Sequence, residues 1–248
     1  MKTAILNKLA SIEKKKNIEI LFACESGSRA WGFASPDSDY DIRFIYKHKT
    51  EWYLNLWEKK DTIEFMTAED LDGSGWDLRK ATLLLAKSNA SLLGWLFSPV
   101  IYRADESFLK EIQTLANENF NPVAGFYHFH SMSKSFLDKV IEEEVSLKSF
   151  FYALRTTLCS NWILKNGTIP PVVFAELLVL VDADIKVAIE ELVAIKATKN
   201  ESFQALKNDT LFNYLKDMIT KNNLNRNSVL LNKADGESFN EFFLKTVV

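Results

Sequence analysis

The sequence predicts an α+β protein, with strands confined to the first hundred residues and helices beyond them. A strand-like apolar run at residues 18–24 and an alternating segment at residues 39–47 flank a loop that contains Gly, Ser and Pro. After about residue 105, apolar residues recur at helical spacing and no convincing alternating strand remains. The chain has only 8 glycines and 5 prolines, too few for the turns of an all-β sandwich. We expect an α/β domain over residues 1–104 and a helical domain over residues 105–248.

The charge balance excludes a protein that coats nucleic acid. The chain carries 30 Lys and Arg against 33 Asp and Glu, a formal net charge of −3. Proteins that bind nucleic acid along most of their surface are strongly basic, because neutralised phosphates supply their affinity. Any contact with nucleic acid is therefore expected to be local.

The sequence predicts a cytoplasmic protein without a membrane partner. Polar residues interrupt the apolar run near the N-terminus, so we expect no signal peptide. The longest apolar stretch, at residues 172–181, contains Glu176 and is shorter than the ~20 residues that a membrane span needs. Cys24 and Cys159 lie in apolar surroundings without zinc-ligand spacing, so we expect reduced core thiols.

The N-terminal elements follow from hydrophobic periodicity. Ile5, Leu9 and Ile12 share a helical face, and the apolar run after them is typical of a strand that is buried on both faces. The run at 39–47 should pair with that strand across the intervening loop. We expect further strand structure at residues 61–65 and 66–72, and we expect it to be interrupted near Gly73.

Helices should dominate from there on. Residues 74–77 have the Ser-x-x-Asp form of a capping box ahead of the apolar run 78–86, so a helix is expected to begin there. The amphipathic segments that follow are at 106–119, 122–143, 146–165, 171–181, 184–198 and 202–222, with a last apolar patch at 239–248.

The most informative segment combines a small-residue turn with a pair of acids. Gly27 and Ser28 follow the first strand, and Asp39 and Asp41 open the second. Two carboxylates two residues apart on a strand share a face and repel each other unless a cation lies between them. Mg²⁺ suits such hard oxygen ligands, and it completes its shell with substrate phosphates and water. The pattern predicts a metal site for a phosphate-bearing substrate.

The turn offers contacts for the phosphates. Gly27 lacks a Cβ and would let backbone N–H groups approach phosphate oxygens, while Ser28 adds a hydroxyl donor. Arg29 could add a charge-assisted hydrogen bond.

These residues resemble the DNA polymerase β-like nucleotidyltransferase superfamily, which is marked by Gly-Ser before a helix and Asp-x-Asp on the next strand. Further segments resemble the YcgL/RlaP-type predicted nucleotidyltransferases, a branch associated with RNA repair. These segments are residues 27–32, 72–80, 87–89 and 95–99, then Lys148, Tyr152, Arg155, Trp162, Ile163, Pro170 and Pro171. The resemblance spans roughly residues 18–180, and its joint set of motifs is more specific than Gly-Ser alone.

The resemblance implies a mixed-sheet catalytic domain in which Asp39 and Asp41 bind Mg²⁺ or Mn²⁺ with a third carboxylate on a neighbouring strand. Asp72 is our candidate for that third ligand. Asp70 shares its face by the strand period of two and remains a rival. Asp77 is disfavoured, because the capping box gives it a structural role.

Three side chains of the helical half fall on one stripe. Lys148, Tyr152 and Arg155 stand at positions i, i+4 and i+7, and the resemblance covers all three. They are candidate nucleotide-binding residues that would clamp the triphosphate or the base. The alternative is that Tyr152 packs in the core while the two cations reach solvent.

The expected reaction is attack of an acceptor hydroxyl on a nucleoside triphosphate, and the resemblance suggests an RNA end as the acceptor. A small molecule or a protein hydroxyl is an alternative acceptor. A non-catalytic module that binds a nucleotide or a partner is the alternative from another class. The sequence indicates neither the nucleotide nor the oligomeric state, and residues after 180 match no motif that we recognise.

Overall fold

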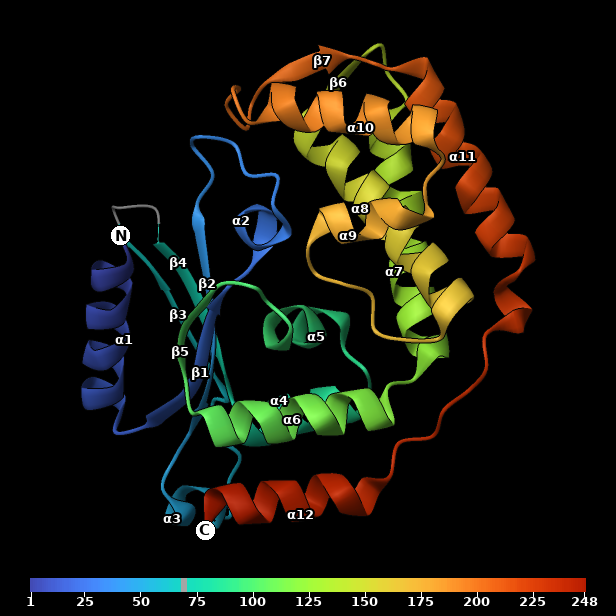
Figure 1. The fold of residues 1–248 in the computed structure, drawn as a ribbon. Coiled ribbons are helices and arrows are strands. Elements are labelled where there is room, and N and C mark those ends of the chain that lie inside the picture. Colours follow the sequence, from blue (N-terminus) through green and yellow to red (C-terminus); the bar gives the residue numbers. More distant parts are fainter. Residues whose placement is uncertain (68–70) are drawn as a thin grey trace. The chain divides into compact units, whose positions relative to one another are not determined.

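The computed structural model describes residues 1–67 and 71–248 and divides into two compact units that interleave along the chain. The first unit comprises residues 1–30, 39–120 and 233–248, and the second comprises 31–38 and 121–232. A five-stranded sheet lies in the first unit, whereas helices dominate the second (Figure 1). The predicted α+β class is confirmed. The two units do not follow the expected boundary after residue 104.

The sheet of the first unit is mixed. Its strands are β1 (Glu19–Glu25), β2 (Tyr40–Lys47), β3 (Thr62–Met66), β4 (Leu71–Asp77) and β5 (Ile101–Ala104), in the order β3-β4-β2-β1-β5. β1 pairs antiparallel with β2, as predicted, and with β5. β4 runs parallel to β2 and antiparallel to β3. The beginnings of β2 and β4 therefore lie at the same edge of the sheet.

Helices cover both faces of this sheet. α1 (Lys2–Lys16) lies on one face, where Ile5 and Leu9 pack into a core with Phe44 and Tyr46 of β2 (Figure 1). α4 (Leu78–Ala86), α5 (Ala90–Leu96) and α6 (Glu106–Asn119) lie on the other face, and α12 (Gly236–Val247) runs beside α6. Six of the seven residues of β1 are buried, as expected for a strand that is covered on both sides.

The expected break near Gly73 is wrong, because β4 runs through both of its glycines to Asp77. A Cβ built on Gly73 would lie 2.1 Å from Cε1 of Phe65, and one on Gly75 would lie 2.1 Å from Cε2 of Phe44. Aromatic rings of the neighbouring strands β3 and β2 thus occupy the space above these glycines. Here glycine marks a close approach within a strand and not a turn.

The predicted capping box at residues 74–77 does not form as expected. Ser74 lies within β4, and α4 begins at Leu78 with Asp77 as its N-cap residue. The backbone N–H of Arg79 donates to Oδ1 of Asp77 at 2.8 Å. Asp77 therefore has the structural role that the sequence predicted, but at the N-cap position and without Ser74 as its partner.

The second unit is built around α7 (Pro122–Leu137) and α8 (Leu147–Asn166), against which α11 (Asp209–Leu224) packs. α10 (Ala183–Lys196) matches the expected helix, whereas α9 (Phe174–Leu177) and the 3₁₀ turn after it are much shorter than the predicted 171–181. A small antiparallel ladder joins β6 (Glu144–Ser146) to β7 (Gln204–Leu206). The expectation of no strand after residue 105 is therefore wrong.

Residues 31–38, which connect the Gly-Ser turn to the acidic pair, belong to the second unit. Phe33 stacks on Phe151 of α8 with the ring centroids 4.9 Å apart. The buried Lys196 donates from Nζ to Oγ of Ser35 at 2.7 Å, and Ser38 donates from Oγ to Oε1 of Glu201 at 2.8 Å. Phe151 of α8, Lys196 of α10 and Glu201 thus hold this connecting loop.

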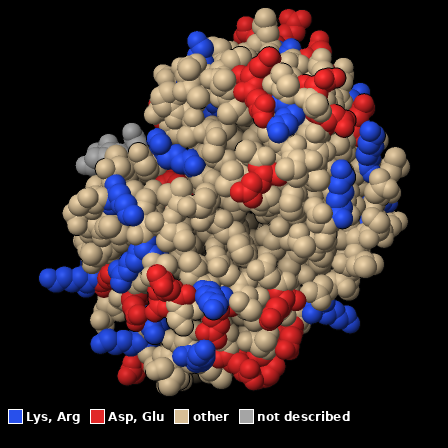
Figure 2. Space-filling model, viewed as in Figure 1, with Lys and Arg blue, Asp and Glu red and all other residues tan. Residues whose placement is uncertain are grey.

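On the face shown in Figure 2, the blue Lys and Arg side chains and the red Asp and Glu side chains are interspersed, so charge of one sign does not cover this face. Within residues 1–67 and 71–248, no helix combines the length and the apolarity that crossing a bilayer requires.

Candidate active site

Two of the predicted acids lie side by side at the edge of the sheet where β2 and β4 begin. Asp41 of β2 and Asp72 of β4 are register partners in the parallel ladder. Because register partners on adjacent strands point to the same face, the two carboxylates share one side of the sheet. Both side chains are partly exposed, at 30% for Asp41 and 36% for Asp72, so solvent reaches them.

Arg43 joins the two carboxylates, and the sequence analysis did not single it out. Its Nη2 atom donates to Oδ1 of Asp41 at 2.8 Å and to Oδ2 of Asp72 at 2.9 Å. Its Nη1 atom donates to the main-chain oxygens of Ile42 and Asp72, both at 3.1 Å. Arg43 is two residues beyond Asp41 and so lies on the same face of β2. This period-two spacing of acid, acid and base was visible in the sequence.

Gly27 has a role that differs from the one predicted. Its backbone is left-handed, with φ at +63°, and a Cβ at this position would lie 2.0 Å from Oδ2 of Asp41. The space that the missing side chain leaves is filled by the Asp41 carboxylate. The neighbouring Ser26 donates its backbone N–H to the main-chain oxygen of Asp41 at 2.8 Å. The turn after β1 is thus fitted to Asp41.

A second residue that the sequence analysis missed is the buried acid Glu25. Its Oε1 accepts the backbone N–H of Asp41 at 2.7 Å, and the hydroxyl of Tyr102 donates to its Oε2. Burial raises the pKa of Glu25, and the hydrogen bonds from Tyr102 and Asp41 oppose that rise. Glu25 therefore anchors the main chain of β2 at Asp41. A charged residue that ends an apolar strand directly before the Gly-Ser turn was the available signal.

Arg29 and Asp39 flank this edge. Arg29 lies on the short helix α2 (Gly27–Trp31), and its Nε donates to the main-chain oxygen of Asp39 at 3.1 Å. The guanidinium also lies over the ring of Tyr40, with 4.0 Å between Cζ and the ring centroid. Asp39 is exposed just before β2, and Ser28 is partly buried on α2. Arg29 thereby ties α2 to the start of β2.

The three candidates for the third carboxylate differ in their surroundings. Asp72 lies beside Asp41, whereas Asp70 lies outside the described residues. Asp77 is the register partner of Tyr46, five positions along β4 from Asp72. It is buried, and Tyr53 donates its hydroxyl to Oδ2 of Asp77 at 2.8 Å. Burial raises the pKa of Asp77, against the hydrogen bonds from Tyr53 and Arg79.

The predicted stripe on α8 is engaged in contacts within the second unit. Lys148 pairs with Glu201, with Nζ 2.7 Å from Oε2. Tyr152 packs edge-on against the ring of Trp31 at 5.1 Å between centroids. Arg155 is buried, with Cζ 4.4 Å from the Trp31 ring centroid and Nη2 3.5 Å from the main-chain oxygen of Val172. Tyr152 and Arg155 thus hold Trp31, at the start of the loop 31–38.

The donor chemistry of Asp41 and Asp72 suits a divalent ion. Within the described part of the chain, no cluster of three or more His, Cys, Asp or Glu is arranged to hold a metal. The two carboxylates nevertheless provide hard oxygen donors, and they already share one positive charge, that of Arg43. The residues present therefore fit Mg²⁺ or Mn²⁺ as a common cation in place of the guanidinium.

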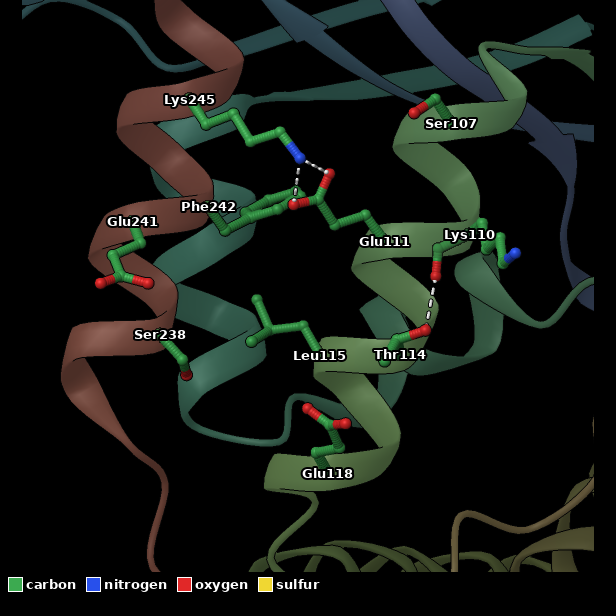
Figure 3. A pocket seen from close by; sticks show the side chains of 10 residues that line it. All are labelled: Ser107, Lys110, Glu111, Thr114, Leu115, Glu118, Ser238, Glu241, Phe242 and Lys245. Carbon is green, nitrogen blue, oxygen red and sulfur yellow. Dashed lines mark hydrogen bonds and ion pairs between the residues drawn. The ribbon is translucent and has the colours of Figure 1, made fainter.

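A pocket elsewhere in the first unit does not include these residues. It measures about 570 Å³ and lies between α6 and α12 (Figure 3). Lys245 crosses it to Glu111, with Nζ 2.9 Å from each carboxylate oxygen. None of the predicted site residues lines this pocket.

Comparison with known proteins gives the same family that the motif residues resemble. The RlaP family, described as an RNA repair pathway DNA polymerase beta family, matches residues 1–245. The chain is 38% identical over 224 residues to the uncharacterized protein YcgL of Bacillus subtilis (strain 168), covering 89% of this chain and 86% of that protein. A crystal structure of a nucleotidyltransferase-like protein from Exiguobacterium sibiricum 255-15 aligns over 96% of this chain and 77% of that chain, with 11% identity and a TM-score of 0.29. Since the family match extends over nearly every residue, the chain belongs to the RlaP family of DNA polymerase β-like proteins.

Proposed function

We propose that this chain is a divalent-metal-dependent nucleotidyltransferase that transfers a nucleoside monophosphate from a nucleoside triphosphate to a hydroxyl acceptor. The observation that carries this proposal is the paired carboxylate site: Asp41 and Asp72 lie in register and share one cation. Like charges are costly to hold together, and a divalent cation bound between the two carboxylates would remove that cost.

Each site residue has a proposed role. Asp39, Asp41 and Asp72 hold Mg²⁺ or Mn²⁺, with Asp72 also accepting a hydrogen bond from the acceptor hydroxyl. The bound metal supplies charge neutralisation for the triphosphate. Ser28, Arg29 and the main chain at Gly27 bind phosphate oxygens, Ser28 as a hydroxyl donor and Arg29 as a charged donor.

The proposed chemistry is an in-line displacement. The acceptor hydroxyl gives its proton to Asp72, and its oxygen forms a bond to the α-phosphorus. The bond from that phosphorus to the oxygen that bridges it to the β-phosphate breaks, and pyrophosphate leaves. The protein contributes mainly by positioning the two substrates and by stabilising the charge that moves to the leaving oxygen.

The stripe on α8 is proposed to support nucleotide binding through the loop 31–38. Tyr152 and Arg155 contact Trp31, and the chain continues from that loop into Asp39. Lys148 pairs with Glu201, which also binds Ser38 of the same loop. These contacts support a positioning role for all three side chains.

An RNA end is the proposed acceptor, because the family is named for an RNA repair pathway. The formal net charge of −3 agrees with a contact that is local and not spread over the surface. A small molecule or a protein hydroxyl would use the same site chemistry.

A second candidate is a non-catalytic module that binds a nucleotide or a partner. Arg43 favours it, because a guanidinium between two carboxylates satisfies them without a metal. The two candidates differ in whether any acceptor gains a label.

The test is transfer of a label from α-labelled nucleoside triphosphates, supplied with Mg²⁺ and an RNA, protein or small hydroxyl acceptor. The wild type is compared with the double variant Asp39→Asn/Asp41→Asn, and Asp217→Asn, an exposed site on α11, is the matched control. The proposal expects transfer by the wild type and the control and loss in the double variant. Nucleotide binding without transfer to any acceptor would support the module.

A further inference from the structure

We infer that Arg43 is a resident counter-cation that competes with the divalent metal for Asp41 and Asp72, so that metal binding requires release of its guanidinium. The inference rests on the proposed function, because it concerns the same metal site. It assigns to Arg43 a role in metal binding that the sequence analysis did not propose.

The competition follows from the position of a single atom. Nη2 of Arg43 lies 2.8 Å from Oδ1 of Asp41 and 2.9 Å from Oδ2 of Asp72. A Mg²⁺ ion binds carboxylate oxygens at about 2.1 Å. An ion bound to both of these oxygens would need the space that Nη2 fills, and its charge would repel the guanidinium. A metal bound through these two oxygens and this pose of Arg43 therefore exclude each other.

The remaining contacts of Arg43 allow a partial release. Its Nη1 atom bonds to the main-chain oxygens of Ile42 and Asp72, both at 3.1 Å, and neither bond uses a carboxylate. The guanidinium can keep this anchor to the β2–β4 edge while Nη2 leaves the acids. After release, its positive charge stays beside the site, where the triphosphate is the anion that can take the freed donor.

The same geometry explains how the two carboxylates can lie side by side when no metal is bound. Asp41 and Asp72 are adjacent carboxylates, and one bridging cation removes their mutual repulsion. Removing Arg43 would leave that repulsion in place, so the metal-free protein should lose stability and a metal should restore it. A purely structural ion pair at this position would not be reversed by metal.

The test is Mn²⁺ affinity, measured on the full chain by the loss of the free-ion electron paramagnetic resonance signal. Arg43→Gln should bind Mn²⁺ about tenfold more tightly than the wild type, the order of effect expected when one competing unit charge is removed. Arg43→Lys keeps the charge and should lie between the two. The control is Arg103→Gln, which removes the ion pair to Glu13 in the same unit and should match the wild type.

The outcomes separate this inference from the proposed function. Equal or weaker binding by Arg43→Gln, with Mn²⁺ binding intact in the wild type, overturns the inference and leaves the proposed metal site standing. Absence of Mn²⁺ binding from both wild type and variant overturns the proposed metal site and the inference with it.

A second readout follows Mg²⁺ binding in the wild type and does not depend on the folding of Arg43→Gln. The Arg43 Nε–H resonance, assigned by its absence from Arg43→Lys, should shift when Mg²⁺ is added. A resonance that stays in place while Mg²⁺ binds overturns the inference.

Discussion

The Oδ2 atom of Asp41 lies where a side chain at position 27 would begin, since a Cβ built on Gly27 would be 2.0 Å from it. This contact links the turn after β1 to the first acid of the parallel β2–β4 edge. Both residues of the motif, Gly and Asp, are therefore parts of one packing arrangement.

Replacing Gly27 by Ala should abolish label transfer by displacing the Asp41 carboxylate. It should also cost about 1–2 kcal/mol of folding free energy, because the left-handed backbone disfavours a Cβ. Gly167→Ala is the matched control: its φ is +65°, close to the +63° of Gly27. Apart from its chain neighbours, no described residue has an atom within 4 Å of its ideal Cβ. The control should lose similar stability and keep transfer. Equal activity in the two variants would contradict the role given to Gly27.

Replacing Gly75 by Ala should destabilise the sheet by about 1–3 kcal/mol, the usual cost of overpacking a core. Its Cβ would meet the Phe44 ring at 2.1 Å, with the ring held in the core. Gly94→Ala, in α5 with open space around its Cβ, should instead stabilise the protein by about 0.5–1 kcal/mol. Urea unfolding measures both changes. A neutral Gly75→Ala would show that the ring moves freely.

Replacing Asp77 by Ala should lower the stability of the protein without abolishing label transfer. The variant loses the N-cap bond to Arg79 and leaves the Tyr53 hydroxyl without its acceptor, a loss of about 1–3 kcal/mol. Transfer per folded molecule should persist, because Asp77 lies at the other end of β4 from Asp72. Thermal melting combined with the transfer assay tests both points, and a folded but inactive Asp77→Ala would reassign the third carboxylate.

Stability should fall in mild acid because of the buried His130 on α7, which stacks on Phe126. Burial, and next the charge of Lys134, lowers the pKa of His130 below its ordinary value of 6.5. As pH falls through 6.5, the unfolded chain takes up a proton that the folded chain does not, so the free energy of unfolding decreases. His130→Gln should flatten that decrease between about pH 7 and pH 5. Urea unfolding at several pH values measures this decrease. If the free energy of unfolding falls with pH equally steeply in the wild type and in His130→Gln, the result would contradict this assignment.

Local patterns predicted much of the fold. The pairing of β1 with β2 and the bounds of α6 follow from periodicity and capping residues close by in the sequence. The continuation of β4 through Gly73 could not be predicted, because it depends on Phe65 of the neighbouring strand covering that glycine. The ladder between β6 and β7 joins segments about sixty residues apart and too short to show alternation.

The sequence also predicted part of the candidate site. The acid pattern pointed to Asp41, and the resemblance to Asp72, which proves to be its register partner. Arg43 and Glu25 were not predicted, because their importance lies in hydrogen bonds to Asp41 that only the folded chain creates. The stripe on α8 was predicted from helical spacing and from the resemblance, and neither could reveal that Arg155 is buried against Trp31.

The most direct measurement compares transfer from α-labelled and γ-labelled nucleoside triphosphates in the wild type and in Asp72→Asn, with Asp77→Asn as the matched carboxylate control. We expect the acceptor to gain the α-label and not the γ-label in a divalent-metal-dependent reaction. Asp72→Asn should lose this transfer, and folded Asp77→Asn should keep it. Transfer of the γ-label, or α-label transfer that survives in Asp72→Asn, would contradict a nucleotidyltransferase centred on Asp41 and Asp72.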